Sequence, residues 1–132
     1  MRLTILEYSM SYQLYAIRIF SIKWDQSFRF YKETLGLPLF YSDAELGWAQ
    51  FDVGAAYIGL ERCDDSTESA ELVGRFVGIS LQVNDIEATY TSLKAKGVEF
   101  TSPPEQQAWG GTLAHFKDPD GNIITLLDAK GD

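Results

Sequence analysis

The sequence predicts a mixed α+β domain made of two similar βαβββ modules. Two stretches that alternate apolar and polar residues, Ala16–Ile22 and Gly78–Asn84, align without a gap, and each predicts a strand. Each is followed by a segment with helical spacing, then by a short strand and a hairpin. The predicted order of elements is therefore βαβββ, polar linker, βαβββ.

Two segments, Asp25–Gly36 and Asp85–Gly97, predict helices of about three turns. The aspartate that opens each one is the expected N-cap, and the glycine that closes each one is the expected C′ residue, because glycine adopts positive φ without steric cost. Apolar side chains recur at spacings of three and four, which predicts a core-facing stripe on each helix. The stripes are Phe28, Tyr31 and Leu35 in the first helix and Ile86, Tyr90 and Leu93 in the second.

The remaining strands follow from apolar runs bounded by turn residues. They are Leu37–Tyr41, Trp48–Val53, Tyr57–Glu61, Val98–Thr101, Thr112–Phe116 and Ile123–Leu127, with turns at Gly54 and at Asp118–Asn122. We expect one domain over residues 1–132, with module one at about 14–62, a linker at 63–75 and module two at about 76–128. The linker is rich in Asp, Ser, Thr and Glu, which predicts a mobile connection. Met10 is an alternative start, which would make residues 1–9 an optional extension.

Composition excludes several classes of partner. The formal net charge of -8 argues against nucleic acid, whose phosphates need a basic face, and weakly favours cationic ligands. No apolar run reaches the roughly 18–20 residues of a membrane helix. Cys63 is the single cysteine, so no intrachain disulfide can form and a cytoplasmic location is expected. It is either a reactive thiol or, the simpler alternative, a plain strand-end residue.

Several short motifs occur in a characteristic order and spacing. They are Phe30-Tyr31 ahead of Leu35-Gly36, Gly97-Val98 after the second helix, Trp109-Gly110, and the turn Asp118–Asn122 with the sequence DPDGN. Together they resemble the vicinal oxygen chelate superfamily, which includes glyoxalase I, bleomycin-resistance proteins, fosfomycin-resistance enzymes and extradiol dioxygenases. The resemblance spans about residues 14 to 128. It implies a U-shaped, mostly antiparallel sheet around a cavity, helices outside, and a homodimer in which halves of two chains complete each cavity.

The alternation of the strands agrees with a sheet that has two different faces. One parity is aliphatic and should pack on the helices: Ile17, Ile19, Ile58, Leu60, Ile79, Leu81, Val83, Ile124 and Leu126. The other mixes polar, aromatic and very small residues: Ala16, Arg18, Phe20, Tyr57, Gly59, Glu61, Gly78, Ser80, Gln82, Ile123 and Thr125. Such a mixture suits a ligand pocket. The predicted ligand-binding residues are Arg18, Phe20, Trp48, Tyr57, Glu61, Ser80, Gln82, Trp109 and Thr125.

In metal-using relatives, four side chains of the inner face hold a divalent ion. The resemblance places those positions at Ala16, Gly59, Gly78 and Thr125, and three of these residues have no donor atom in the side chain. A neutral threonine hydroxyl does not hold Zn²⁺, Mn²⁺ or Fe²⁺ alone. The sequence therefore predicts no metal and no cofactor, and the branch that it resembles is that of the bleomycin-resistance proteins.

The favoured function is non-covalent binding of an organic small molecule, with a resistance or sequestration role. The alternatives are a metal-free enzyme acting through Glu61, Arg18, Tyr57 or His115, and a sensing module with a vestigial pocket; a metal-dependent lactoylglutathione lyase or dioxygenase is less favoured. The roles of four residues stay open. An unpaired Arg18 would favour an anionic ligand, whereas a pair with Glu61 would leave the pocket nearly neutral. His115 is either a base or a strand residue facing solvent or a neighbour. The tryptophans Trp48 and Trp109 either contact ligand or pack hairpins.

Overall fold

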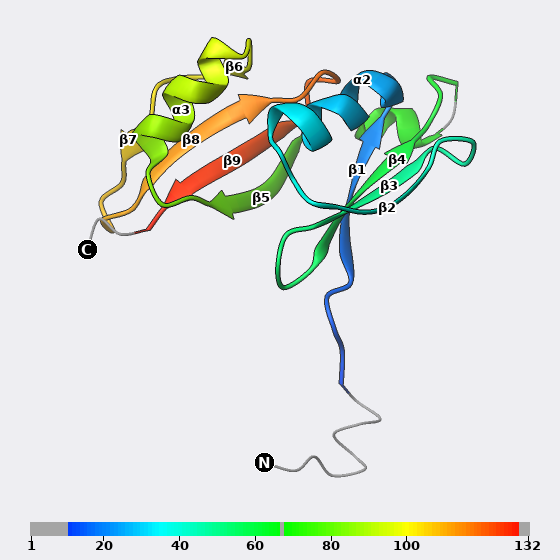
Figure 1. The fold of residues 1–132 in the computed structure, drawn as a ribbon, viewed down its shortest axis with the longest axis horizontal. Helices are drawn as coiled ribbons and strands as arrows, with labels where there is room; N and C mark the ends of the chain where they lie inside the picture. The colour runs from blue at the N-terminus through cyan, green and yellow to red at the C-terminus, as the bar shows by residue number, and fades with distance from the viewer. Residues whose placement is uncertain (1–10, 67, 130–132) are drawn as a thin grey trace.

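The computed structural model describes residues 11–66 and 68–129, so Met10 and the segment 1–9 lie outside the described residues. Thirteen elements follow one another along the chain (Figure 1). Those of module one are β1 (Ala16–Ser21), α2 (Trp24–Arg29), the π-helical turn η1 (Phe30–Thr34), β2 (Leu39–Asp43), β3 (Trp48–Asp52) and β4 (Tyr57–Arg62). After the 3₁₀ turn η2 (Glu68–Leu72) come β5 (Phe76–Gln82), α3 (Ile86–Ala95), β6 (Glu99–Phe100), β7 (Glu105–Gln106), β8 (Thr112–Lys117) and β9 (Ile123–Asp128).

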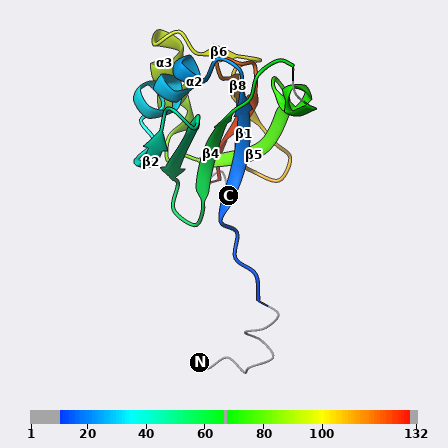
Figure 2. The ribbon, with the colours of Figure 1, turned by 90° about the vertical axis from the view of Figure 1, so that its right-hand side faces the viewer.

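The strands form one sheet in each module, which confirms the α+β class and the repeated design. Module one has the predicted βαβββ order, and module two has one strand more, the short β7, which was not predicted. Sheet one has the order β1-β4-β3-β2, and sheet two has the order β5-β9-β8-β6, with β7 also paired to β8. In each sheet the first and last strands of the module pair in parallel, and the other pairs are antiparallel. The two sheets lie side by side with their helices on the same side (Figure 1 and Figure 2), and within the described residues β1 and β5 each pair with a single strand.

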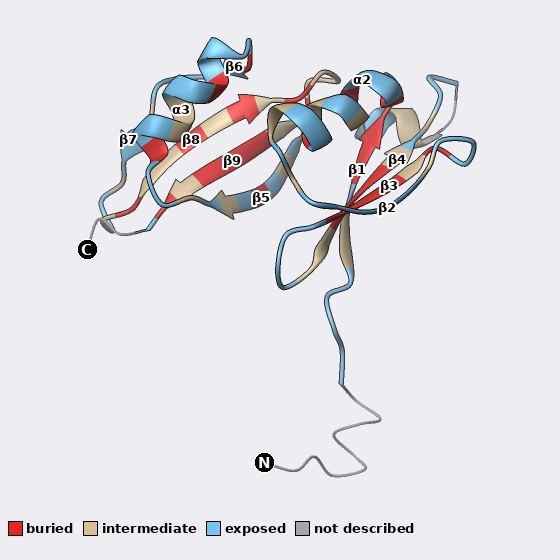
Figure 3. Ribbon diagram, viewed as in Figure 1, coloured by how far each residue is buried: buried red, intermediate tan, exposed pale blue. Residues whose placement is uncertain are grey.

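The core lies between the helices and the aliphatic face of each sheet (Figure 3). Six of the nine residues predicted to face the helices are buried: Ile19, Ile58, Leu60, Ile79, Ile124 and Leu126. The other three, Ile17, Leu81 and Val83, are partly buried against the same cluster. The predicted helix stripes contribute Tyr31, Ile86 and Leu93 to the core, and Trp24, which was not predicted, joins them. Strand parity therefore predicted these aliphatic residues correctly, but Phe20, which it placed on the opposite face, is also buried at 6% exposed.

The ends of the helices agree with the sequence at three places out of four. Asp85 caps α3 by accepting a hydrogen bond from the backbone N–H of Ala88 at 3.0 Å. Gly36 and Gly97 follow the two helices with φ of 72° and 91°, in the left-handed region that a C′ glycine adopts. No helix in the part of the chain that the structure describes is long and apolar enough to cross a membrane.

The start of α2 differs from the prediction. Its N-cap is Lys23, and Asp25 lies in the first turn without capping it, so the expected Asp25 cap is wrong. The reason is an acceptor in the other module. The Asp120 carboxylate accepts hydrogen bonds from the backbone N–H groups of Ile22 and Lys23 at 3.0 and 2.9 Å. Because this carboxylate already holds the chain just ahead of the helix, a local aspartate cap is not required.

The turn Asp118–Asn122, between β8 and β9, fastens module two to module one; we call it the turn joint. Asp120 accepts hydrogen bonds from the hydroxyls of Ser21 and Ser27 besides the two backbone groups. Both serines are fully buried, so their hydroxyls need an acceptor inside the protein. A motif that reads as a simple hairpin turn in the sequence therefore provides an intermodule contact.

Asn122 extends the turn joint in two directions. Its side-chain Nδ2 donates to the carbonyl oxygen of Phe20 at 3.0 Å, at the end of β1. Its Oδ1 accepts from the backbone N–H groups of Gly74 and Arg75 at 2.8 and 3.3 Å, at the end of the linker. The linker, predicted to be mobile, contains the turn η2, and its far end is hydrogen-bonded to this amide.

A buried pair completes the turn joint. The Tyr31 hydroxyl donates to Asp118 Oδ2 at 2.7 Å, and Tyr31 is fully buried. Burial raises the pKa of the Tyr31 phenol well above its usual value, and the Asp118 carboxylate raises it further. Burial also raises the pKa of Asp118, although the hydrogen bonds from Tyr31 and Asn122 favour its charged form.

Replacing Asp120 should destabilise the whole chain. Asp120→Ala leaves four donors of module one without their acceptor, and we expect a loss of about 3 kcal/mol in the free energy of unfolding. Urea denaturation at neutral pH measures it. Asp65→Ala, an exposed linker aspartate, is the matched control and should cost under about 0.5 kcal/mol. Equal stability of the two variants would show that the turn joint contributes nothing.

Tyr31→Phe should cost stability in a pH-dependent way. At pH 7 the variant loses the hydrogen bond to Asp118, which is worth about 1–3 kcal/mol because the acceptor is charged and buried. Above pH 10 the phenol of an unfolded chain releases its proton, whereas folded Tyr31 retains it. Deprotonation therefore favours the unfolded state, and the contribution of Tyr31 to the free energy of unfolding falls as pH rises. The difference in the free energy of unfolding between wild type and Tyr31→Phe should decrease by about 1 kcal/mol between pH 7 and pH 11. Tyr12→Phe, at an exposed residue, should show no such narrowing.

Candidate functional site

The two sheets each have a face that points away from the helices, and we call these the open faces. On the open face of sheet one, Arg18 Nε lies 3.2 Å from Glu61 Oε1. The Arg18 guanidinium also lies 5.2 Å from the centre of the Phe20 ring. The sequence left open whether Arg18 is unpaired, and the structure shows the pair with Glu61. Because the two side chains are 58% and 39% exposed, the pair adds little stability but leaves this part of the face nearly neutral.

A row of polar and aromatic side chains runs beside this pair. Trp48 Nε1 donates to Gln50 Oε1 at 3.2 Å, and Gln50 Nε2 donates to the Tyr15 hydroxyl at 2.7 Å. The ring of Tyr15 lies 5.3 Å from that of Tyr57. Gln50 and Tyr15 were absent from the predicted site, although Gln50 shares the strand parity of Trp48 and could have been found by that signal. The row fixes the Trp48 indole against the sheet, where it covers Gly59.

Phe40 is a further aromatic residue that the sequence analysis missed. Its ring lies 4.9 Å from that of Tyr57, and the residue is 59% exposed. The pairing of β2 with β3 shifts between Leu39 and Tyr41, so Phe40 departs from regular alternation. A bulge of this kind cannot be located from parity alone, which explains why the residue was missed.

On the open face of sheet two, three residues lie in register across three strands. Ser80 of β5 is opposite Thr125 of β9, and Thr125 is opposite His115 of β8. His115 Nδ1 lies 2.8 Å from Thr125 Oγ1, and the imidazole contacts the Phe76 ring edge-on at 6.0 Å. His115 thus faces a neighbour on the same face as two predicted site residues. Gln82 lies further along β5 with the parity of Ser80 and is exposed.

Trp109 lies apart from the other predicted site residues. It sits in the loop between β7 and β8, is 63% exposed, and covers Gly111 with its indole. Among the described residues we find no hydrogen bond or ring contact between Trp109 and the rest of the predicted set. Of the two roles considered for Trp109, packing of a hairpin agrees with this placement better than contact with a ligand.

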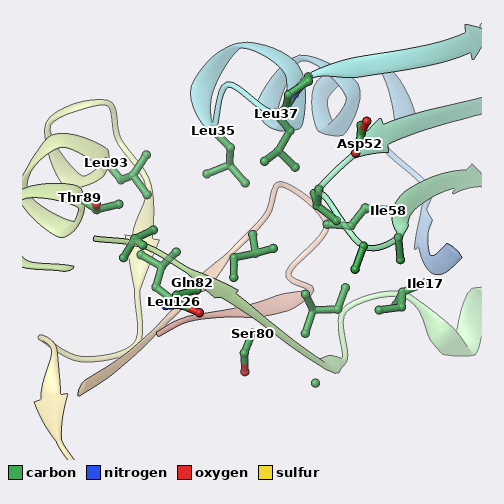
Figure 4. A pocket seen from close by; sticks show the side chains of 18 residues that line it. Ile17, Leu35, Leu37, Asp52, Ile58, Ser80, Gln82, Thr89, Leu93 and Leu126 are labelled. Atoms are coloured by element: carbon green, nitrogen blue, oxygen red, sulfur yellow. The ribbon is translucent and has the colours of Figure 1, made fainter. Parts of the chain in front are cut away.

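A groove of about 620 Å³ lies between the modules on the side of the helices (Figure 4). Leu35, Ile58, Leu93 and Leu126 are among its aliphatic walls, and Asp52 is its one charged lining residue. The groove does not contain the predicted site: it touches only Ser80 and Gln82 of that set, and in Figure 4 the Ser80 side chain points away from the aliphatic cluster. An apolar body fits such a groove, but few polar groups are present to orient it.

The residues at the four positions where relatives hold a metal do not fit an ion. Ala16, Gly59 and Gly78 supply no side-chain donor, and the Thr125 hydroxyl is engaged by His115. At Gly59 there is also no space, because a Cβ atom there would lie 2.2 Å from Cη2 of Trp48. Across residues 11–66 and 68–129, no three or more His, Cys, Asp or Glu residues gather in a way that could hold a metal ion.

The comparisons with known proteins agree with this fold. Residues 14–126 match the family described as the Glyoxalase/Bleomycin resistance protein/Dioxygenase superfamily. The chain belongs to this superfamily. It is 32% identical to the uncharacterized protein YraH of Bacillus subtilis over 124 residues, which are 86% of this chain and 96% of that protein. A probable lactoylglutathione lyase of Vibrio parahaemolyticus is 34% identical over 116 residues, covering 80% and 83% of the two chains.

Other proteins similar to this chain bear names that refer to antibiotics. A bleomycin resistance protein of Klebsiella pneumoniae is 28% identical over 111 residues, covering 79% of this chain and 82% of that protein. The solved structure of TnmS3, described as an antibiotic binding protein from Streptomyces sp. CB03234, is 25% identical with a TM-score of 0.74 and coverage of 92% and 98%. A superfamily member from Sphaerobacter thermophilus reaches a TM-score of 0.76 at 27% identity, with coverage of 90% and 98%.

Divalent metals should leave the stability of the chain unchanged. Any ion that binds the folded state more tightly than the unfolded state raises the melting temperature. With Mn²⁺, Ni²⁺, Zn²⁺ or Fe²⁺ we expect a thermal shift no larger than the scatter of replicates, and elemental analysis of the purified protein should find no stoichiometric metal. A stoichiometric metal content, or a melting-temperature shift of several degrees with one of these ions, would contradict the conclusion that the four positions do not fit a metal ion.

Proposed function

We propose that this chain binds an organic small molecule non-covalently at the open faces of its sheets, in a resistance or sequestration role. The observation that carries the proposal is the open face of sheet one. There a neutralised ion pair, Arg18 and Glu61, lies in the same sheet as a hydrogen-bonded row of Trp48, Gln50 and Tyr15. Aromatic surface with a few oriented polar groups is the composition of small-molecule sites.

The names of two relatives support this choice among the activities of the superfamily. One is called a bleomycin resistance protein and the other an antibiotic binding protein. A lyase name also occurs among the relatives, but the four positions of the metal ligands do not fit an ion here. The ligand class that the face supports is a planar or cationic organic molecule: aromatic rings accept a planar body, and a net charge of -8 attracts cations over longer distances.

A metal-free enzyme is the alternative, and the contacts favour it less. Glu61 is occupied by Arg18, so it is not free to act as a base without breaking that pair. Thr125 and His115 form a hydroxyl–imidazole pair, but Thr125 is only 3% exposed, so its hydroxyl is poorly placed to attack a substrate. We therefore place binding ahead of catalysis. The single cysteine suits the reducing cytoplasm that we include in the proposal.

We also propose a homodimer that encloses the open faces. Several large side chains that a single chain leaves in water support it: Phe40 and Phe76 are each 59% exposed, and Trp109 is 63% exposed. The edge strands β1 and β5, each paired on one side within the described residues, offer backbone groups to a second chain. Size-exclusion chromatography with light scattering should give twice the mass of 14.8 kDa at micromolar concentration. A monomer at all concentrations would overturn the homodimer.

The Arg18–Glu61 pair allows a test of the binding face by charge. Arg18→Gln leaves Glu61 uncompensated, so affinity for 2-naphthylmethylamine should rise and affinity for 2-naphthoic acid should fall. Glu61→Gln should have the opposite effect, and each change should be about 0.5–1 kcal/mol because the pair is partly exposed. The double variant is the matched control and should return both affinities close to wild type. Calorimetry measures the constants; single variants without opposite effects would exclude this face as the binding site.

A further inference from the structure

We infer that His115 offers its Nε2–H group to an oxygen acceptor of the ligand, and that Thr125 is the positioning residue that fixes this tautomer. The inference rests on the proposed binding function and deepens it. It assigns a residue outside the four positions at which relatives hold a metal. It also names the ligand group that binds at sheet two, which is a carbonyl oxygen on a planar molecule.

The first step is the contact between the two side chains. His115 of β8 and Thr125 of β9 are directly opposite each other, and Nδ1 lies 2.8 Å from Oγ1. A distance of this size is a hydrogen bond, but it does not show which atom carries the proton. Either the threonine hydroxyl donates to a bare Nδ1, or an Nδ1–H group donates to the hydroxyl oxygen.

The burial of Thr125 selects between these two arrangements. Thr125 is 3% exposed, and its hydroxyl has one hydrogen-bond partner among residues 11–66 and 68–129, which is His115. If Nδ1 carried the proton, the hydroxyl proton would have no acceptor in the described chain, and an unpaired buried donor is costly. The hydroxyl therefore donates, Nδ1 accepts, and the proton of the neutral ring resides on Nε2.

The second nitrogen is open to a ligand. Nε2 of His115 has no hydrogen-bond partner in the part of the chain that the structure describes. Every buried side-chain nitrogen or oxygen atom in that part has a hydrogen-bond partner. Because Nε2 has none and His115 is only half-buried, this atom is in contact with solvent. The ring thus holds one nitrogen against the sheet and presents the other on the open face.

The neighbours of His115 define the rest of the ligand. The imidazole meets the ring of Phe76 edge-on at 6.0 Å, and Phe76 is 59% exposed, so an aromatic surface lies next to the N–H donor. The nearest cation along β8 with the same parity is Lys117, and it lies 3.4 Å from Glu99. Because that ammonium has a carboxylate partner, His115 is the donor best placed to select an oxygen on a planar molecule.

The tautomer is tested first, without any ligand. In long-range ¹H–¹⁵N spectra of ¹⁵N-labelled protein in alkaline buffer, we expect the pattern of a neutral imidazole protonated at Nε2. Thr125→Val removes the hydroxyl and should shift the spectrum towards a mixture of tautomers, a change that loss of packing alone would not produce. An Nδ1–H pattern in the wild-type protein would overturn the inference.

Binding is tested with two planar probes of similar size, coumarin and naphthalene, of which only coumarin carries a carbonyl. The wild-type protein should bind coumarin roughly five- to tenfold more tightly, which is the effect of one hydrogen bond. His115→Phe keeps a flat ring without a donor and should abolish the preference, whereas His115→Gln, which retains an N–H donor, should restore part of it. Chemical-shift titration gives both constants and maps the binding face.

The outcomes separate this inference from the function on which it rests. A coumarin preference that survives in His115→Phe would overturn the role of His115 while leaving small-molecule binding in place. If neither probe perturbs resonances on either open face, the proposed binding function fails for planar molecules, and the ligand class assigned to His115 fails with it. The tautomer measurement stands separately, because it reports on Thr125 without a ligand.

Discussion

The turn joint is the interaction on which the rest of the structure depends. Three polar side chains belong to one hairpin turn: Asp118, Asp120 and Asn122. Together they form hydrogen bonds to a strand end, to the start of a helix and to the linker. Their partners in module one are mostly backbone groups and buried hydroxyls, which need acceptors or donors from somewhere in the protein. These hydrogen bonds join the two modules, although within the described residues no strand of one sheet pairs with a strand of the other.

The helices occupy one face of each sheet, and the opposite faces carry exposed or half-buried side chains such as Arg18, Ser80 and His115. Each open face combines aromatic rings with polar groups that are already bonded to one another, such as Gln50 with Tyr15 and Thr125 with His115. Such groups are oriented before a ligand arrives, which lowers the entropic cost of binding.

The fold was largely predictable because alternation and helical spacing both have a direct physical cause. Strand parity identified the buried aliphatic residues, and Asp85 and Gly97 marked the ends of α3. The failures came from contacts distant in sequence. Asp25 looked like an N-cap because nothing local revealed that Asp120, far along the chain, holds the residues before α2. No sequence pattern distinguishes a turn that only reverses the chain from one that also bonds to another module.

The candidate site was predictable to a lesser extent. Parity assigned the open faces correctly, but it could not show that Arg18 pairs with Glu61, since that depends on the register of β1 against β4. Phe40 was hidden by a bulge. The role of His115 stayed open because its contact with Thr125 depends on the register of β8 against β9, which the sequence does not reveal. Side-chain pairing across strands is a tertiary property, and one sequence contains little information about it.

Gly59 limits which side chains its position can carry. The Trp48 indole fills the space where a side chain at position 59 would begin, with a separation of 2.2 Å from a Cβ atom. A mutation that introduces histidine or glutamate there meets the indole, and a mutation that removes the indole leaves a void over a glycine. Either single change is disfavoured, so a side-chain donor at position 59 requires a change at position 48 as well. The packing of Trp48 on Gly59 therefore couples the two positions.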